Sequence, residues 1–258
     1  MSVTRRSAMI GACVLAISAC TTGTASLSAA PKIVLVAGAT GRTGTTVVGQ
    51  LMAEGYTVRA LVRDPVKARV TFGDKVSNFT GDVTEPATLT PAMQGVDAVI
   101  SVIGAKGKDS ASRAEVIDYA GVRNLTVAAS AAGVKQFVLV SSRGVTRENN
   151  SLNRMFGDLL KWKLKGEDAL RASGVPYTII RPGGLRDGKP GEKAFVIEQG
   201  DKSAGQTTIA RADLATICVQ ALRYPETRNR TFEVNTIEGS PITDWRARFA
   251  ELKPDASR

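Results

Sequence analysis

Three evenly spaced glycines follow the first strongly apolar segment of the chain. Residues 33–37 read IVLVA, and Gly38, Gly41 and Gly44 come after them. Glycines at these places let the chain turn tightly, let its backbone approach a pyrophosphate, and let a helix pack closely on the sheet. The free N–H groups of that helix would face the phosphates. The pattern predicts a dinucleotide-binding turn, to which we also assign Thr40, Arg42 and Thr43.

Arg63 occupies the position whose residue type usually decides whether a dinucleotide-binding domain prefers NAD or NADP. An acidic residue about 20 positions after the glycines would bind the ribose 2′-hydroxyl of NAD. Arg63 lies 19 positions after Gly44, and Asp64 follows it. A guanidinium pairs with a 2′-phosphate that a carboxylate would repel, and Arg42 adds a second positive charge. We predict NADP as the cofactor, with NAD less favoured; the alternative is a solvated Arg63 paired with Asp64.

Short apolar runs alternate with helical patterns along most of the chain. Runs typical of strands cover 33–37, 57–62, 99–103, 137–140 and 177–180, with a weaker candidate at 76–79. Patterns typical of helices cover 43–53, 113–132, 152–172 and 211–222. Continuous apolar strands are typical of parallel sheets that are covered on both faces. We predict a single α/β domain over residues 31–258, with a doubly wound parallel sheet of the Rossmann type and an irregular segment at 183–205.

Several segments together resemble atypical short-chain dehydrogenases/reductases, including NmrA-like proteins and relatives of biliverdin-IXβ reductase. The matching segments are 34–44 (VLVAGATGRTG), 59–65 (RALVRDP), 97–102 (DAVISV), 138–142 (VLVSS), 173–185 (SGVPYTIIRPGGL) and 209–215 (IARADLA). The resemblance implies that Asp82 and Val83 flank the adenine of a bound NAD(P). It also implies that Val102, Ile103 and Gly104 line the path of the ribose and nicotinamide.

The catalytic pair that this resemblance implies is incomplete. Ser141 and Ser142 match the region of the substrate-orienting serine, and Lys163 matches the lysine of a Tyr-x3-Lys pair. That lysine lowers the pKa of the tyrosine, which exchanges a proton with the substrate. Leu159 stands where the tyrosine would be, and leucine has no proton to give.

Two functions therefore remain open. One is an oxidoreductase that acts on a small carbonyl, quinone or flavin-like substrate and takes its proton from Ser142, a water or the substrate. The other is a non-catalytic, NADP-binding sensor or assembly factor of the cell envelope. We favour the oxidoreductase slightly, because Ser142 and Lys163 are retained.

The composition excludes several other kinds of site. The 258 residues contain no histidine and only three cysteines, at 13, 20 and 218. Histidine-based catalysis, His-ligated zinc and a four-thiolate metal site are thereby excluded. The net charge is +10, but aromatic residues make up only 5%, and no known nucleic-acid module is visible. We predict no metal and no nucleic-acid partner.

Residues 1–20 have the pattern of an export signal. Arg5 and Arg6 precede a small, apolar run at 8–19, which is too short to span about 30 Å of hydrocarbon. The run ends in ISAC, which resembles a bacterial lipobox with Cys20 as the lipidated residue. We predict a signal peptide at 1–20, a flexible tether at 21–30, and a protein that is exported to the cell envelope, where a lipid on Cys20 would attach it to the membrane. If the leader is not functional, the protein is cytoplasmic.

Overall fold

The computed structural model describes Met1 and residues 32–105, 113–147, 150–202 and 207–256. The predicted signal peptide, Cys20 and the tether lie outside these described residues, except for Met1. In the described part, an eight-stranded sheet has the order β3-β2-β1-β4-β5-β6-β10-β8. All neighbouring strands are parallel except β8, which runs antiparallel to β10. The strands are β1 (Ile33–Ala37), β2 (Thr57–Val62), β3 (Ser77–Thr80), β4 (Ala98–Ser101), β5 (Gln136–Val140), β6 (Tyr177–Pro182), β8 (Ala194–Glu198) and β10 (Arg230–Ile237).

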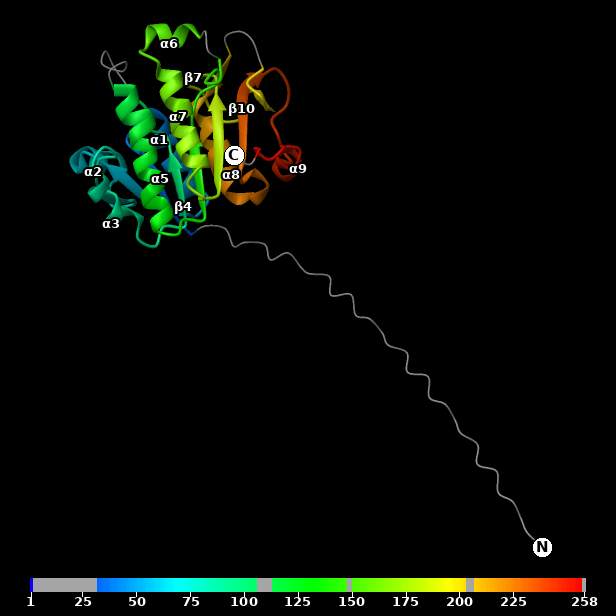
Figure 1. Cartoon of the computed structure of the whole chain (residues 1–258), viewed down its shortest axis with the longest axis horizontal. Coiled ribbons are helices and arrows are strands. Elements are labelled where there is room, and N and C mark those ends of the chain that lie inside the picture. The colour runs from blue at the N-terminus through cyan, green and yellow to red at the C-terminus, as the bar shows by residue number, and fades with distance from the viewer. Residues whose placement is uncertain (2–31, 106–112, 148–149, 203–206, 257–258) are drawn as a thin grey trace.

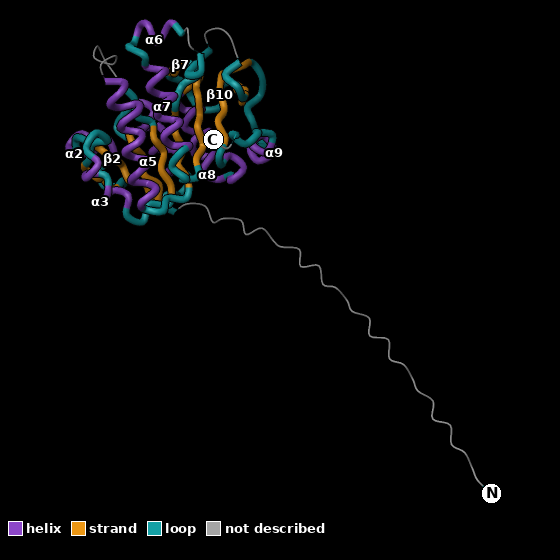
Figure 2. The backbone as a smooth tube through the Cα atoms, viewed as in Figure 1, coloured by secondary structure: helices purple, strands orange, loops and turns teal. Residues whose placement is uncertain are grey.

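Helices cover both faces of this sheet (Figures 1 and 2). Successive side chains of a strand point to opposite faces, so Val34 and Val36 of β1 lie in one apolar core and Leu35 and Ala37 in another. The first core includes residues of α1 (Arg42–Ala53), α2 (Pro65–Phe72), α8 (Arg211–Arg223) and α9 (Trp245–Ala250). The second includes residues of α3 (Thr90–Met93), the π-helical turn η2 (Glu115–Gly121), α5 (Val122–Ala131) and α7 (Leu159–Arg171). The predicted doubly wound fold is thus confirmed.

The structure corrects the predicted helix at 152–172. A short helix α6 (Ser151–Met155) precedes α7, and the chain turns between them at Gly157 and Asp158, both with φ of 58°. Such a left-handed backbone cannot continue a right-handed helix. The break places Leu159 as the first residue of α7.

The prediction of an irregular segment at 183–205 is wrong in part. It contains β7 (Gly184–Arg186), which pairs with β9 (Thr208–Ala210) in a separate two-stranded sheet. It also contains β8, the edge strand of the main sheet. Charged and glycine residues around both strands hid the apolar pattern. Within the described residues, no helix is long and apolar enough to cross a membrane.

Candidate functional site

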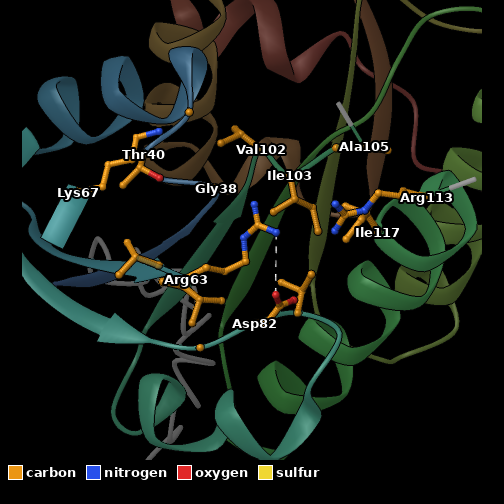
Figure 3. A pocket seen from close by; sticks show the side chains of 16 residues that line it. Gly38, Thr40, Arg63, Lys67, Asp82, Val102, Ile103, Ala105, Arg113 and Ile117 are labelled. Atoms are coloured by element: carbon orange, nitrogen blue, oxygen red, sulfur yellow. Dashed lines mark ion pairs between the residues drawn. The ribbon is translucent and has the colours of Figure 1, made fainter. Parts of the chain in front are cut away.

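A pocket of about 310 Å³ lies at the carboxyl ends of β1, β2, β3 and β4 (Figure 3). The chain continues from β1 to β2 on one side and returns to β4 on the other. This reversal of strand order is where open α/β sheets bind their ligands. Nine of the predicted cofactor residues line the pocket, namely Gly38, Thr40, Gly41, Arg63, Asp82, Val83, Val102, Ile103 and Gly104.

The glycine turn has the geometry that a pyrophosphate requires. Gly38 has a φ of +84°, and a Cβ added to it would lie 3.0 Å from the carbonyl oxygen of Val102. A Cβ on Gly44 would lie 2.1 Å from the carbonyl oxygen of Gly38, so Gly44 holds α1 against the turn. Gly41 is the N-cap of α1, and no side-chain hydrogen bond caps this end. The free N–H groups and the positive end of the helix dipole fit a phosphate.

Arg63 extends into the pocket from the end of β2 (Figure 3). Its side chain is 66% exposed, and its Nη1 lies 4.0 Å from Asp82 Oδ2. Asp64 caps α2 instead, because its carboxylate accepts a hydrogen bond from the N–H of Lys67 at 2.9 Å. The Asp64 carboxylate is therefore not paired with the Arg63 guanidinium, so Asp64 does not compete with an incoming phosphate for Arg63.

Two further cationic residues, Lys67 and Arg113, line the pocket and were not predicted from the sequence. For Lys67 a signal was available, because Asp64 followed by Pro65 is typical of a helix start. That start places Lys67 in the first turn of α2, and its side chain lies beside Thr40 in the pocket (Figure 3). No comparable signal precedes Arg113.

Three of the predicted turn residues, Arg42, Thr43 and Gly44, lie outside the lining. The guanidinium of Arg42 forms an ion pair with Asp187, which also accepts from Nη1 of Arg211 at 2.9 Å. The hydrogen bond from Arg42, together with the charges of both arginines, holds the pKa of Asp187 below its ordinary value. Arg42 thus connects the glycine turn to the segment after β7, and its predicted role toward a 2′-phosphate stays a prediction.

The structure brings Ser141 and Lys163 together and leaves Ser142 apart. Ser141 and Lys163 line a second, small cavity behind Ile103, which also lines the main pocket. The hydroxyl of Ser142 donates instead to the carbonyl oxygen of Arg143, 3.1 Å away. The predicted serine pair therefore divides into one residue that faces Lys163 and one that does not.

Asp118 is the partner of Lys163 that the sequence did not disclose. Nζ of Lys163 donates to Asp118 Oδ1 at 2.7 Å, and the N–H of Ala105 donates to Asp118 Oδ2 at 2.9 Å. Asp118 is one acidic residue in an otherwise helical pattern, so only its burial marks it as special. In the described residues, no group of three or more Cys, Asp or Glu residues is arranged to hold a metal ion.

This strand order, glycine turn and pocket define a Rossmann-type nucleotide-binding protein, and the residues present fit an NAD(P) molecule. Residues 38–225 match the family described as NAD(P)H-binding. The chain therefore belongs to the NAD(P)H-binding family of atypical short-chain dehydrogenase/reductase-like proteins, as its sequence resemblance predicted.

Two relatives and one solved structure show how far this similarity extends. The chain is 37% identical to the uncharacterized chloroplastic protein At2g37660 of Arabidopsis thaliana, over 90% of this chain and 78% of the relative. It is 33% identical to sanguinarine reductase of Eschscholzia californica, over 85% of this chain and 95% of that enzyme. A putative NAD-dependent epimerase/dehydratase from Bacillus halodurans shares the fold with a TM-score of 0.73 and 24% identity, over 81% of this chain and 96% of that one.

Proposed function

We propose that the protein is an NADP(H)-dependent oxidoreductase that reduces a small carbonyl, quinone or flavin-like compound. The observation that carries the cofactor choice is Arg63, whose guanidinium lines the pocket next to the glycine turn. Lys67 adds a second cation to the same lining. A 2′-phosphate forms charge-assisted hydrogen bonds with such cations, whereas the uncharged 2′-hydroxyl of NAD forms no ion pair with them.

Each part of the pocket has its own task in this proposal. The backbone at Gly38 and Gly41 holds the pyrophosphate at the start of α1, and Asp82 and Val83 flank the adenine. Val102, Ile103 and Gly104 form the wall toward the nicotinamide. The bound cofactor would supply a hydride at that wall. The similarity to sanguinarine reductase supports a reductive reaction.

Titration of the purified protein with NADPH and NADH tests the cofactor assignment. We expect NADPH to bind more tightly, and the difference to shrink at high salt because the selective contacts are ionic. NADPH oxidation would then be followed with a panel of quinones, flavins and aldehydes. Equal affinity for the two cofactors would contradict the NADP assignment.

The second candidate function is a non-catalytic, NADP-binding sensor or assembly factor. Leu159 favours it, since the first turn of α7 carries no phenol that could give a proton to a substrate with the help of Lys163. The same experiments separate the two functions. A non-catalytic protein binds NADPH but oxidises it with none of the acceptors.

We also propose that the protein is exported to the cell envelope and anchored through a lipid on Cys20. The pattern of Arg5 and Arg6, the apolar run and ISAC supports this proposal. A twin-arginine route would export the protein folded and with its cofactor bound. Such a route would account for NADP(H) binding by a protein outside the cytoplasm.

A further inference from the structure

Asp118 is a buried carboxylate on η2, and it holds Lys163 in one place. Its side chain is 1% exposed, whereas that of Lys163 is 16% exposed. One carboxylate oxygen accepts from the lysine ammonium and the other from the N–H of Ala105. A buried carboxylate is costly unless it is paired and hydrogen-bonded. Both oxygens are satisfied here, and the lysine side chain is fixed as a consequence.

Ser141 provides a third polar group at the same place. Its hydroxyl oxygen is buried and has no hydrogen-bond partner among the described residues. Together with Asp118 and Lys163, Ser141 lines a cavity of about 10 Å³, which is at the lower limit of the space that one water needs. A buried hydroxyl without a partner costs free energy. This cost argues that Ser141 does more than fill space.

The cluster of Asp118, Lys163 and Ser141 lies directly behind the wall of the cofactor pocket. A Cβ added to Gly104 would lie 3.7 Å from Nζ of Lys163 and 3.4 Å from Oδ1 of Asp118. Gly104 itself lines the main pocket. Because glycine has no side chain, the lysine ammonium comes close to the part of the pocket assigned to the nicotinamide. An ammonium carries three N–H donors, and Asp118 engages one of them.

We propose that Lys163 is the proton donor of the reductive reaction, in place of the tyrosine that Leu159 replaces. Asp118 and Ser141 are its positioning residues. This inference rests on the proposed oxidoreductase function. It assigns Ser141, not Ser142, to the site, and it adds an acidic residue that the Tyr-x3-Lys pattern does not contain.

The bonds and charges of the step balance for a carbonyl acceptor. The acceptor carbon gains the hydride that the reduced cofactor supplies, and the C=O double bond becomes a single bond. The oxygen takes one proton from the Lys163 ammonium, so one N–H bond breaks and one O–H bond forms. Lys163 is left as a neutral amine beside the Asp118 carboxylate. It recovers its proton from solvent by way of the small cavity and the hydroxyl of Ser141.

Two substitutions of Lys163 separate proton transfer from charge. Lys163→Arg keeps a positive charge, but a guanidinium does not give up its proton in proteins. We expect this variant to bind NADPH within about threefold of wild type, yet to lose roughly 10²–10⁴-fold in turnover. Lys163→Gln, which lacks both charge and proton, should lose turnover to the same extent. Lys161→Gln, at an exposed position on the same helix, is the matched control and should leave turnover unchanged.

The role of Asp118 and Ser141 has a readout that does not depend on turnover. The rate at which an amine-reactive reagent acylates Lys163 is measured across a range of pH by mass spectrometry, with Lys165 in the same digests as the internal control. In Asp118→Asn, Lys163 loses the carboxylate that accepts its hydrogen bond at 2.7 Å, so its acylation relative to that of Lys165 should become faster. In Ser141→Ala, recovery of the proton should slow turnover while NADPH binding and the acylation of Lys165 stay unchanged.

The outcomes distinguish this inference from the function on which it rests. If wild type oxidises NADPH with none of the acceptors, the oxidoreductase function fails, and the proton donor fails with it. If wild type is active and Lys163→Arg keeps turnover within about threefold, only the proton-donor assignment is overturned. Unchanged acylation of Lys163 in Asp118→Asn would overturn the positioning role of Asp118.

Discussion

Arg63 and Asp82 face each other in the cofactor pocket, with 4.0 Å between Nη1 of the arginine and Oδ2 of the aspartate. They follow β2 and β3, which are neighbours in the sheet. Asp82 is also engaged on its other oxygen, because Oδ1 accepts from the N–H and the hydroxyl of Thr84 at 2.9 Å each. Its carboxylate is thus fixed, whereas the guanidinium of Arg63 is free to turn toward a second anion.

Arg63→Ala should weaken the binding of NADP(H) and leave that of NAD(H) nearly unchanged. The variant loses a charge-assisted contact to the 2′-phosphate, which is worth roughly 1.5–3 kcal/mol. Isothermal titration of the variant with both cofactors measures the difference. Arg69→Ala, an exposed position on α2 outside the pocket lining, is the control. Equal weakening of both cofactors by Arg63→Ala would show that Arg63 does not select the phosphate.

Gly41→Val should abolish the binding of both cofactors while the fold survives. Gly41 caps α1 where the pyrophosphate would approach the backbone, so a branched side chain occupies that approach. Cofactor titration and circular dichroism measure the two effects. Gly49→Val is the matched control, since a Cβ on Gly49 meets nothing within 4 Å. Normal cofactor binding by Gly41→Val would show that this turn holds no pyrophosphate.

The Rossmann core was predictable because its signals are local. The buried strands read as continuous apolar runs, and the glycines of the turn follow the first run directly. β10 could not be found in this way, because Glu233 and Asn235 within it are polar and yet buried. Glu233 is satisfied by Arg181 of β6, 3.1 Å away. Only the folded arrangement shows that these polar positions belong to a central strand.

The candidate site likewise contains residues that could be predicted from the sequence and contacts that could not. Arg63 was found because its distance along the chain from the glycines decides its place at the end of β2. Asp118 and Lys163 are 45 positions apart in the chain, and no spacing rule joins η2 to α7. The placement of Arg42 against Asp187 depends on the segment after β7, whose course the sequence did not indicate.

Asp97→Asn should lower the free energy of unfolding at neutral pH. Partial burial works to raise the pKa of Asp97, but hydrogen bonds from the N–H groups of Ile33 and Lys32 and from the Lys135 ammonium outweigh it and lower the pKa. A lowered native pKa stabilises the fold above the ordinary value of 3.8, and this stabilisation is lost as the pH falls below it. We expect a loss of about 1 kcal/mol at pH 7.

Urea unfolding of wild type and Asp97→Asn at several pH values measures this linkage. The difference in the free energy of unfolding between wild type and Asp97→Asn should become smaller as the pH falls through the acidic range. Asp74→Asn, at an exposed position after α2, should show no such difference. If the difference in the free energy of unfolding stays constant down to acidic pH, the charge of Asp97 does not stabilise the fold.

Cys20→Ala should remove a lipid from the mature protein. Metabolic labelling with palmitate in a bacterial host, followed by separation of membranes, measures both lipid and location. We expect wild type to be labelled and recovered with membranes, and Cys20→Ala to be unlabelled. Cys13→Ala, within the apolar run, is the control and should behave like wild type. Unlabelled wild type, or label retained in Cys20→Ala, would contradict the lipobox assignment.

Leu159→Tyr tests whether a latent dehydrogenase site is present. The new phenol would stand four residues before Lys163, on the same face of α7. In an ordinary carbonyl reductase that has lost its acid, restoring the phenol would raise turnover by about 10²–10⁴-fold. Here Lys163, held by Asp118 at 2.7 Å, is proposed to give the proton itself, so an added phenol would duplicate a function that is already present.

We therefore expect Leu159→Tyr to change the turnover of simple carbonyls little. Leu159→Phe is the matched control, since it adds the same ring without the hydroxyl. Comparing the two variants with wild type in NADPH oxidation isolates the contribution of the proton. A gain of about a hundredfold or more in Leu159→Tyr alone, with unchanged cofactor affinity, would contradict this expectation. Such a gain would mean that the pocket is shaped for phenol-assisted carbonyl reduction, with Lys163 assisting the phenol and not giving the proton itself.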